Sequence, residues 1–372
     1  MRYFIIAGEA SGDLHASNLM FELKKVDSKA DFCFLGGDLM QAQGGTLVKH
    51  YREMAFMGFV AVLKNASKIL KNIRVCKAAI THFKPDIVIL VDYPGFNLRM
   101  AKFVKTQLHL PVYYYISPKI WAWKEYRIKN IKLYVDKMLT IFPFETEFYK
   151  KHNFKVEYVG NPTLDSIANR PNQQQSFSDF CSQNNLTMKP VIALLAGSRK
   201  QEIKACLPRM LNAASQFSDY QVVISGAPGI DPDFYNQYTS HNKLPVIFNQ
   251  TYELIHHAKI AIVNSGTATL ETAIIGTPQV VVYSAKFGKL AILAKKVFIK
   301  VKYISLVNLI AEKEVVKELI AHLFTVENLV YEMNNILKNE NHKQYILKEY
   351  GEIKAVLGNP GAATRAAKKI IE

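Results

Sequence analysis

Short apolar runs separated by segments of helix length are the feature of this sequence that most limits its fold. The runs are YFIIA (3–7), DIVILV (86–91), VYYYI (112–116), MLTIF (138–142), VIALLA (191–196), QVVIS (221–225), PVIF (245–248), IAIVN (260–264) and QVVVY (279–283). Strands this apolar are typical of parallel sheets that helices cover on both faces. We therefore predict an α/β protein with two Rossmann-like domains, the first four runs forming one sheet and the last five another.

The domain boundary is predicted from length and from a polar stretch in the middle of the chain. A chain of 372 residues suits two domains of ordinary size. The segment VGNPTLDSIANRPNQQQS (159–176) follows a strand-like KVEYV and combines Gly and Pro with a polar run, which is typical of a linker. We predict a first domain over 1–160, a linker over 161–176 and a second domain over 177–345. Helices over 346–372 then return to the first domain or exchange with a partner.

Cysteine spacing and hydropathy indicate the compartment. The four cysteines show no CxxC pair and no metal-ligand spacing, so we expect neither disulfides nor a zinc site, and a reducing environment. The N-terminal apolar run, Tyr3 to Ala7, is too short for a signal peptide. No stretch approaches the ~20 apolar residues of a membrane span. These features predict a cytoplasmic protein.

An excess of basic over acidic residues indicates an anionic partner. Lys and Arg outnumber Asp and Glu by 47 to 31, a net charge of +16. Such an excess attracts nucleic acid, a phosphorylated substrate or an acidic membrane surface, and the charge alone does not choose among them. Solvated lysines of a generally basic proteome are the alternative.

Ligands of an open parallel sheet bind at the carboxyl ends of its strands, where helix N-termini present free N–H groups. The strand-to-helix turns richest in Gly and polar residues are GEASGD (8–13), VDYPGFN (91–97), AGSRKQE (196–202) and NSGTATLE (264–271). None completes a GxGxxG or a GxxxxGK[ST] motif, which weighs against a dehydrogenase or a kinase.

Two turns of the second half suit a diphosphate. Arg199 in AGSR, at the start of a helix, offers a phosphate a charged fork, although it could simply cap the turn. In NSGTATLE we expect Ser265 or Thr267 as N-cap, Gly266 to permit close approach and Glu271 to accept hydrogen bonds from ribose hydroxyls. Taken alone, this octapeptide would be a capped helix with an exposed Glu271. Two anion-type turns in one half favour the binding site.

Asp92 is the candidate general base. It follows the buried strand DIVILV directly, and partial burial would raise its pKa. The alternative is an N-cap aspartate. We expect no metal and no cofactor, because Asp231 and Asp233 flank a proline in a turn and the histidines lack ligand spacing.

A basic amphipathic stretch over 56–83 suggests a membrane surface. Apolar residues recur at helical spacing beside a stripe of lysines, with more apolar surface ahead of them than one core-facing stripe needs. The predicted membrane-contact residues are Phe59, Val60, Val62, Leu63, Lys64 and Lys68. A second such stretch covers 286–302. A core helix with a solvated basic back is the alternative, and no binding motif supports nucleic acid.

Taken in order, the motifs resemble one family, the lipid-A-disaccharide synthases, which are inverting glycosyltransferases of the GT-B type. The matching segments are AGEASGD (7–13), FMG (56–58), VDYPGFN (91–97), YISPKIWAW (115–123), FPFE (142–145), GNPTLD (160–165), AGSRKQEI (196–203), NSGTATLE (264–271) and YISLVNLIA (303–311). The combination of ISPKIWAW with GSR and SGTATLE is specific. The resemblance implies two Rossmann-like domains with a cleft between them.

The resemblance also implies a reaction and its site. The family transfers 2,3-diacylglucosamine from its UDP donor to 2,3-diacylglucosamine 1-phosphate, forms a β(1→6) disaccharide with inversion and releases UDP, at the cytoplasmic face of the inner membrane. Asp92 would be the base. The implied donor-binding residues are Gly197, Ser198, Arg199, Glu202, Ser265, Gly266, Thr267, Glu271 and Asn308. The implied acceptor-binding residues are Gly8, Glu9, Ser11 and Gly12.

Some positions depart from the family pattern. Ala196 stands where Pro often precedes GSR, Gly95 where many members have a second Asp, and Asn161 where His is common. These departures concern the loop after Asp92 and position 161, and none replaces a residue to which the resemblance assigns a role in the chemistry. The alternatives are another GT-B enzyme that uses UDP-N-acetylglucosamine, a transferase or an epimerase, and a nucleotide- or lipid-binding protein without catalysis. The oligomeric state, a homodimer included, stays open.

Overall fold

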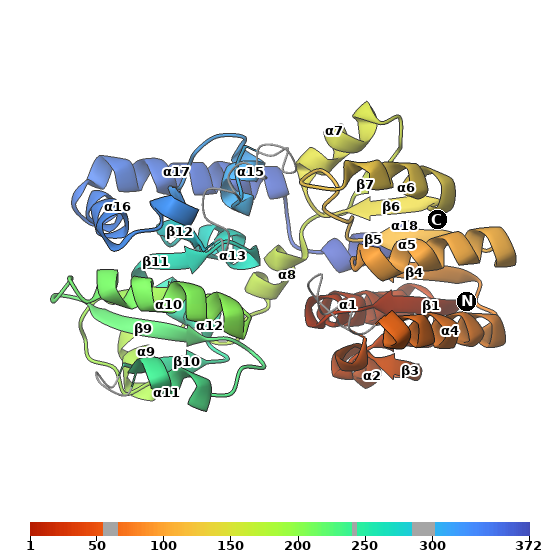
Figure 1. Ribbon diagram of the computed structural model, residues 1–372, viewed down its shortest axis with the longest axis horizontal. Coiled ribbons are helices and arrows are strands. Elements are labelled where there is room, and N and C mark those ends of the chain that lie inside the picture. The colour runs from red at the N-terminus through yellow and green to blue at the C-terminus, as the bar shows by residue number, and fades with distance from the viewer. Residues whose placement is uncertain (55–65, 240–243, 285–301) are drawn as a thin grey trace. The chain divides into compact units, whose positions relative to one another are not determined.

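The computed structural model describes residues 1–54, 66–239, 244–284 and 302–372. The chain divides into two compact units, unit 1 with residues 1–162 and 359–372, and unit 2 with residues 163–358 (Figure 1). Each unit is a parallel sheet with helices on both faces. The predicted fold class is confirmed.

The sheet of unit 1 has the order β3-β2-β1-β4-β5-β6-β7. Its strands are β1 (Arg2–Ala7), β2 (Asp31–Gly36), β3 (Thr46–His50), β4 (Ile87–Val91), β5 (Val112–Tyr115), β6 (Lys137–Thr140) and β7 (Glu157–Tyr158). Its α-helices are α1 (Ala10–Val26), α2 (Asp38–Ala42), α4 (Ala66–Phe83), α5 (Pro94–Phe103), α6 (Ile128–Tyr134), α7 (Pro143–Lys151) and α18 (Ala362–Ile371). Short 3-10 turns cover Tyr51–Glu53 and Glu125–Arg127, and a π-helical turn, Val104–Leu108, extends α5.

The sheet of unit 2 has the order β10-β9-β8-β11-β12-β13. Its strands are β8 (Val191–Leu195), β9 (Gln221–Gly226), β10 (Val246–Phe248), β11 (Ala258–Asn264), β12 (Gln279–Tyr283) and β13 (Glu318–Ile320). Its α-helices are α8 (Pro162–Ala168), α9 (Phe177–Gln183), α10 (Lys200–Ala214), α11 (Asp233–Thr239), α12 (Thr251–His257), α13 (Thr267–Ile275), α15 (Leu306–Ala311), α16 (Val326–Lys338) and α17 (Glu340–Leu357), and a 3-10 turn covers Ala321–Leu323.

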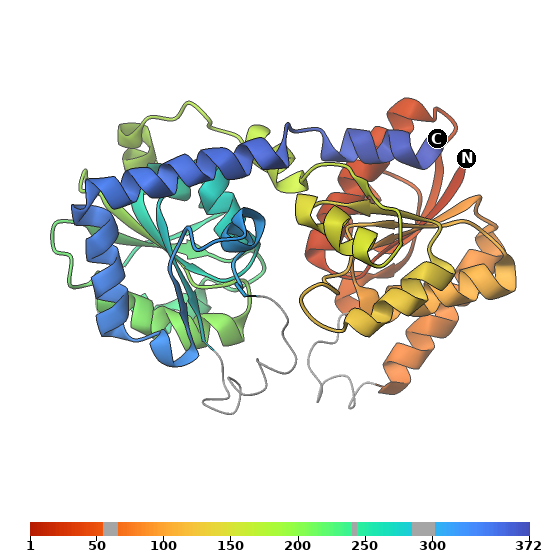
Figure 2. The same cartoon turned by 90° about the horizontal axis from the view of Figure 1, so that it is seen from above.

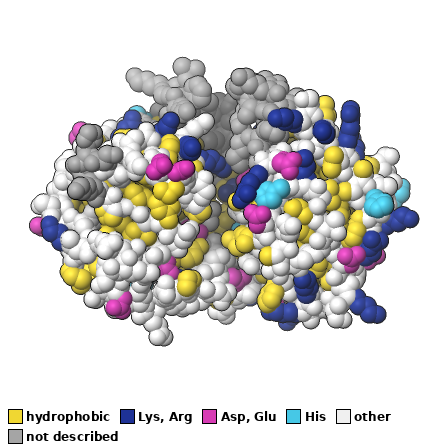
Figure 3. All heavy atoms as spheres, turned by 90° about the horizontal axis from the view of Figure 1, so that it is seen from below, with side chains coloured by type: hydrophobic (Ala, Val, Ile, Leu, Met, Phe, Trp, Pro, Cys, Tyr) yellow, Lys and Arg dark blue, Asp and Glu magenta, His cyan; other side chains and the backbone are white. Residues whose placement is uncertain are grey.

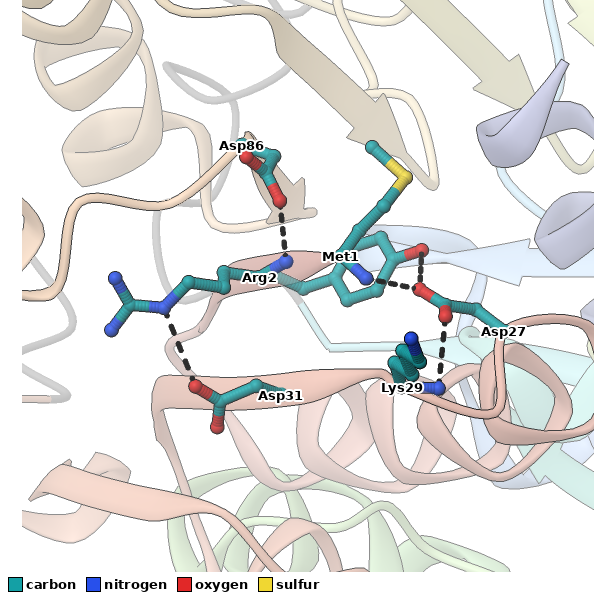
Figure 4. A network of polar contacts seen from close by, with 7 residues as sticks. Met1, Arg2, Asp27, Lys29, Asp31 and Asp86 are labelled. Atoms are coloured by element: carbon teal, nitrogen blue, oxygen red, sulfur yellow. Dashed lines mark hydrogen bonds and ion pairs between the residues drawn. The ribbon is translucent and has the colours of Figure 1, made fainter.

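The central strands form as the sequence predicts because they are apolar on both faces. Every residue of β4 and of β8 is buried. The amino end of β1 is fixed by charge: the Met1 amine donates to Asp27 at 2.6 Å, and the Arg2 N–H donates to Asp86 at 2.7 Å (Figure 4). Hydrogen bonds to neighbouring segments on both sides hold β1 in the middle of its sheet.

The C-terminal segment divides between the two units. Helix α17 belongs to unit 2, so the expected boundary at 345 falls inside a helix of that unit. Helix α18 belongs to unit 1 and packs against α1 (Figure 2), and its small residues Ala363 and Ala367 are buried. Arg365 donates to the carbonyl of Val159 at 2.8 Å, and Thr364 donates to Glu22 at 2.9 Å.

Candidate active site

Each sheet has a point at which the strand order reverses, β1/β4 in unit 1 and β8/β11 in unit 2. The four turns selected from the sequence follow these four strands, at the carboxyl ends where doubly wound sheets bind ligands. The turns after β1 and β4 therefore lie together in unit 1, and those after β8 and β11 in unit 2. Gly and polar residues concentrate at the two places where the topology favours a ligand.

Asp92, the first residue after β4, has an unusual backbone conformation. Asp92 and Tyr93 have positive φ angles, 42° and 46°, in the left-handed region that costs a non-glycine residue ~1–3 kcal/mol. The carbonyl of Asp92 accepts hydrogen bonds from the buried Asn97 amide at 2.7 Å and the Tyr114 hydroxyl at 2.5 Å. Asn97 also donates to the Val91 carbonyl at 3.2 Å. The bonds to the main chain hold this conformation and leave the carboxylate for other contacts.

The carboxyl group of Asp92 is less acidic than an ordinary aspartate. The side chain is half-buried, and desolvation raises its pKa, while the positive charge of Lys119 and a hydrogen bond from the Tyr93 amide oppose the shift. A raised pKa makes the carboxylate a better proton acceptor. The environment therefore suits a general base.

Gly8 and the start of α1 lie against the Asp92 turn. A Cβ at Gly8 would come within 2.1 Å of the Tyr93 ring, so only glycine fits beneath this side chain. Tyr93 donates from its hydroxyl to the Met54 carbonyl at 3.0 Å. Gly8 thus lets the ring after Asp92 pack directly on the end of β1.

The other acceptor candidates occupy the first turn of α1. Glu9 is the N-cap residue, Ser11 is exposed, and Gly12 faces Ala7, 3.3 Å from where its Cβ would stand. The glycine at position 12 therefore permits close packing of helix on strand. The first helical hydrogen bond is from the Asp13 N–H to the Glu9 carbonyl at 2.9 Å, so the preceding amides lie in the turn where helices bind anions.

A buried network joins the motifs ISPKIWAW and FPFE, to which sequence reasoning gave no role. Glu145 is 1% exposed and accepts hydrogen bonds from the amides of Ile141 and Phe142 at 3.1 and 3.0 Å and from the Trp121 indole at 3.2 Å. Burial raises its pKa to about 7. The network fixes the segment after β5 against the start of α7. Proline and Glu at the first and third positions of α7 were the available signal.

In unit 2, Arg199 and Glu202 form an ion pair at the start of α10. The Arg199 guanidinium donates to Glu202 Oε1 at 3.0 Å, and the Ser198 amide donates to Glu202 Oε2 at 3.1 Å. Gly197 has φ 117°, and a Cβ there would lie 2.6 Å from Glu202. The Glu202 carboxylate therefore occupies the kind of position that a phosphate takes, between a helix N-terminal amide and an arginine.

The second turn of unit 2 is capped differently from the prediction. The N-cap of α13 is Gly266, not Ser265 or Thr267, and no side chain caps the helix. The Ser265 hydroxyl instead donates to the Ile304 carbonyl at 3.1 Å, and Thr267 is exposed as the first helical residue. Without a side chain over the helix start, its N–H groups are left for a ligand or for water.

Glu271 lies one turn into α13. It is half-buried and accepts a hydrogen bond from the Tyr252 hydroxyl at 3.1 Å. Desolvation raises its pKa, and the bond from Tyr252 opposes the shift. The alternative of an exposed glutamate does not describe this environment.

Asn308 lies inside unit 2, at the start of α15. Its side chain is fully buried, donates to the Val316 carbonyl at 2.8 Å and to Glu318 at 3.0 Å, and accepts from the amides of Val315 and Val316. Glu318 also accepts from the amides of Ile304 and Ser305. The bonds of Asn308 all run within the protein, so its influence on a ligand would pass through the segment whose Ile304 carbonyl holds Ser265.

The expected membrane-contact residues fall mostly outside the described part of the chain. Phe59, Val60, Val62, Leu63 and Lys64 lie in 55–65, whereas Lys68 is exposed on α4. The apolar stripe of α4, with Cys76 and Ile80, faces the core of unit 1. On the face of unit 1 that Figure 3 shows, Lys and Arg side chains are scattered among other residues. Among the described helices, none has the length and hydropathy needed to cross a bilayer.

Comparisons with known proteins agree along the whole chain. A family model described as lipid-A-disaccharide synthetase matches residues 3–368. The lipid-A-disaccharide synthase of Myxococcus xanthus is 36% identical over 377 residues, which cover 100% of this chain and 97% of that protein. Lipid-A-disaccharide synthase 1 of Legionella pneumophila is 36% identical over 367 residues, with coverage of 97% and 94%.

Solved structures resemble the fold at low sequence identity. The UDP-GlcNAc 2-epimerase from Neisseria meningitidis bound to UDP-GlcNAc has a TM-score of 0.67 at 13% identity, covering 100% of both chains. A kitacinnamycin glycotransferase has a TM-score of 0.66 at 11% identity, covering 100% of this chain and 98% of the other. These likenesses are to proteins of the GT-B architecture and support the same fold for this chain.

Proposed function

The chain belongs to the lipid-A-disaccharide synthase family, a family of glycosyltransferases, and from this membership we propose the substrates and the residue roles of its reaction. It transfers 2,3-diacylglucosamine from the UDP donor to the 6-hydroxyl of 2,3-diacylglucosamine 1-phosphate. The acceptor oxygen bonds to C1 of the donor sugar, the C1–O bond to the diphosphate breaks, and UDP leaves with the electron pair. The observation that carries the proposal is the half-buried Asp92 carboxylate at the strand-order reversal of unit 1.

In unit 1, Asp92 takes the proton of the attacking hydroxyl. Its raised pKa suits a group that must accept a proton as the glycosidic bond forms. The acceptor binds at the first turn of α1, where Gly8, Glu9 and Ser11 lie beside the Asp92 turn, and Gly12 keeps the helix close to β1. The main-chain bonds from Asn97 and Tyr114 keep the base in place during proton transfer.

In unit 2, the two helix starts bind the diphosphate of UDP. The amides at 197–200 and 265–268 and the Arg199 guanidinium stabilise the charge that grows on the leaving group. The diphosphate displaces the Glu202 carboxylate from Ser198 and Arg199, so Glu202 holds the turn ready before the donor arrives. Glu271 accepts hydrogen bonds from the ribose, and Asn308 positions Ser265 through Glu318, which also accepts from the Ile304 amide.

The donor site predicts a loss of UDP affinity in two variants. Arg199→Lys keeps the charge but removes the bidentate fork, and Glu271→Gln removes the charged acceptor for the ribose hydroxyls. Each should weaken UDP binding by about 10- to 100-fold, because a hydrogen bond to a charged group contributes roughly 1.5–3 kcal/mol. Isothermal titration calorimetry with UDP measures the change. The control is Arg209→Lys, on the same helix as Arg199 but over the Phe324 ring. Equal affinities in the wild type and both site variants would contradict the donor assignment.

Both substrates carry acyl chains, and we propose that the enzyme works on the membrane surface, at the cytoplasmic face of the inner membrane. Phe59, Val60, Val62 and Leu63 would enter the lipid, with Lys64 and Lys68 near the anionic headgroups.

Changing Phe59, Val60, Val62 and Leu63 together to serine should release the protein from anionic vesicles, by at least about 10-fold in partition coefficient, because each buried CH₂ contributes ~0.8 kcal/mol. Cosedimentation with vesicles that contain phosphatidylglycerol measures the binding. A double control, Met188→Ser and Tyr331→Ser, removes exposed apolar side chains of unit 2. If the quadruple variant still bound vesicles and the double control did not, the membrane contact would lie outside residues 59–63.

The reaction itself is tested by UDP release in detergent, with the product mass checked. Disaccharide 1-phosphate and UDP in equal amounts are expected from both substrates. UDP binding without disaccharide would favour another GT-B activity, and epimerised UDP-N-acetylglucosamine would identify the alternative that the solved epimerases suggest.

A further inference from the structure

Two cations follow the strand next to the catalytic base. In the register of β4 and β5, Val91 pairs with Tyr115, and the Asp92 amide donates to the Tyr115 carbonyl at 3.3 Å. The chain that leaves β5 therefore starts directly beside Asp92. Ile116, with φ 64°, changes the direction of the chain, and Lys119 follows three residues later.

The segment that carries Lys119 is held from inside the protein. The Ser117 hydroxyl lies 2.7 Å from the Tyr149 hydroxyl, and Trp121 donates to Glu145 at 3.2 Å. Both contacts are buried, whereas Lys119 between them is exposed. A lysine whose neighbours on both sides are fixed presents its ammonium group from a defined place, which lowers the entropy lost when it binds an anion.

Neither Lys119 nor Arg127 has a carboxylate partner within 4.0 Å among the residues that the structure describes. Arg127 ends the 3-10 turn after this segment, with its guanidinium 5.9 Å from the centre of the Trp123 ring. By contrast, Glu125, in the same 3-10 turn as Arg127, pairs with His152 at 3.1 Å, and Lys105 of unit 1 pairs with Asp136 at 2.5 Å. Lys119 and Arg127 therefore keep their charge available for a ligand.

The charges of Lys119 and Arg127 influence the pKa values of Asp92 and of Tyr114. Burial raises the pKa values of Asp92 and Tyr114; the charge of Lys119 lowers that of Asp92, and the charge of Arg127 lowers that of Tyr114. Tyr114 is the residue whose hydroxyl holds the Asp92 carbonyl. Each cation is therefore close enough to influence the base or the tyrosine that supports it.

We propose that Lys119 and Arg127 bind the phosphate of the acceptor sugar and so orient its hydroxyl toward Asp92. The inference rests on the proposed function, because it needs a phosphorylated acceptor. One sugar carries both groups, so anchoring its phosphate restricts the position of the hydroxyl that reacts. Arg127 contributes a planar fork and Lys119 a compact point charge, a combination suited to a phosphate monoester.

The test compares two acceptors, 2,3-diacylglucosamine 1-phosphate and the same lipid without its phosphate, in the wild type, Lys119→Ala and Arg127→Lys. We expect Lys119→Ala to lower kcat/KM for the phosphorylated acceptor by about 10- to 100-fold, because charged hydrogen bonds contribute roughly that much to binding. For the acceptor without phosphate, kcat/KM should change by less than about 3-fold. Arg127→Lys should give a smaller loss of the same selective kind, since it keeps the charge.

Lys124→Ala is the matched control, because Lys124 lies in the same segment with its ammonium over the Trp123 ring at 4.2 Å. Rates are measured on the alkaline plateau, where Asp92 is ionised in every variant. Equal losses with both acceptors, or no loss with either, would overturn the proposal. Disaccharide formation by the wild type keeps the proposed function in either case, whereas its absence from the wild type would refute that function first.

Discussion

Replacing Asp92 with asparagine should lower kcat for disaccharide formation by ~10²–10⁴ while UDP still binds, because asparagine cannot accept the proton of the acceptor hydroxyl. The hydrogen bonds that fix this turn go to the Asp92 carbonyl, from Asn97 and Tyr114, and a change confined to the side chain leaves them in place. The loss should therefore appear in kcat with an unchanged melting temperature. UDP release with product mass spectrometry measures it.

The pH profile of the wild type checks the same assignment. Burial raises the pKa of Asp92, with Lys119 opposing the shift and Tyr93 and Tyr114 packed around the turn. As pH falls through that raised pKa the carboxylate gains a proton and cannot act as a base, so kcat/KM should fall at a higher pH than an ordinary aspartate near 3.9 would give. The residual activity of Asp92→Asn should lack this acid limb. Full activity of the variant, or an unchanged limb in it, would assign the base elsewhere.

Gly8→Ala should also cost activity heavily, at a position that carries no functional group. The new Cβ would stand 2.1 to 2.6 Å from three atoms of the Tyr93 ring, so the ring must move. Tyr93 follows Asp92 directly in the chain, and both residues have left-handed backbone conformations. A shift of the Tyr93 ring would therefore move the Asp92 carboxylate. A misplacement of ~1 Å at a reacting group can cost about 10²-fold in rate. We expect a loss of that order in kcat, measured by the same UDP-release assay.

Gly95→Ala provides the matched control within the same motif. A Cβ at Gly95 would meet no atom within 4 Å, and the residue lies in the first turn of α5, where alanine favours the helix. This variant should keep wild-type activity and gain a little stability. If Gly8→Ala were as active as Gly95→Ala, the ring of Tyr93 would have no part in placing Asp92.

Most strands predicted from the sequence are central and largely buried, although β10 is a predicted strand that lies at an edge with one buried residue; the strands that were not predicted are β2, β3 and β13. β3, TLVKH, has no fully buried residue, and β13 includes the buried carboxylate of Glu318, whereas the two residues of β7 fall in the segment KVEYV that was predicted as strand-like. Short or polar edge strands lack the apolar run that marks a central one. β2, DFCFLG, is the exception: five of its six residues are buried, and its pattern was present in the sequence but was not recognised as a strand.

For the site, the sequence could give the residues at the strand ends but not the contacts that support them. Asp92 and Arg199 follow apolar strands, and parallel strands bring such turns to one edge. Glu145 and Trp121 are 24 residues apart, and Ser265 and Ile304 are 39 apart. No local pattern pairs such distant groups. The cap of α13 shows the result, since a serine expected to cap its own helix is bonded to a distant carbonyl instead.

The return of α18 to unit 1 has a consequence for how the protein is made. The ribosome must synthesise all of unit 2 before residues 359–372 emerge, and only then can α18 cover α1 and Arg365 reach the Val159 carbonyl. Domains generally fold in the order of their synthesis, at ~5–20 residues per second. Here the first unit to appear is the last to be completed. Until then the face of α1 that α18 covers is open to water or to a chaperone.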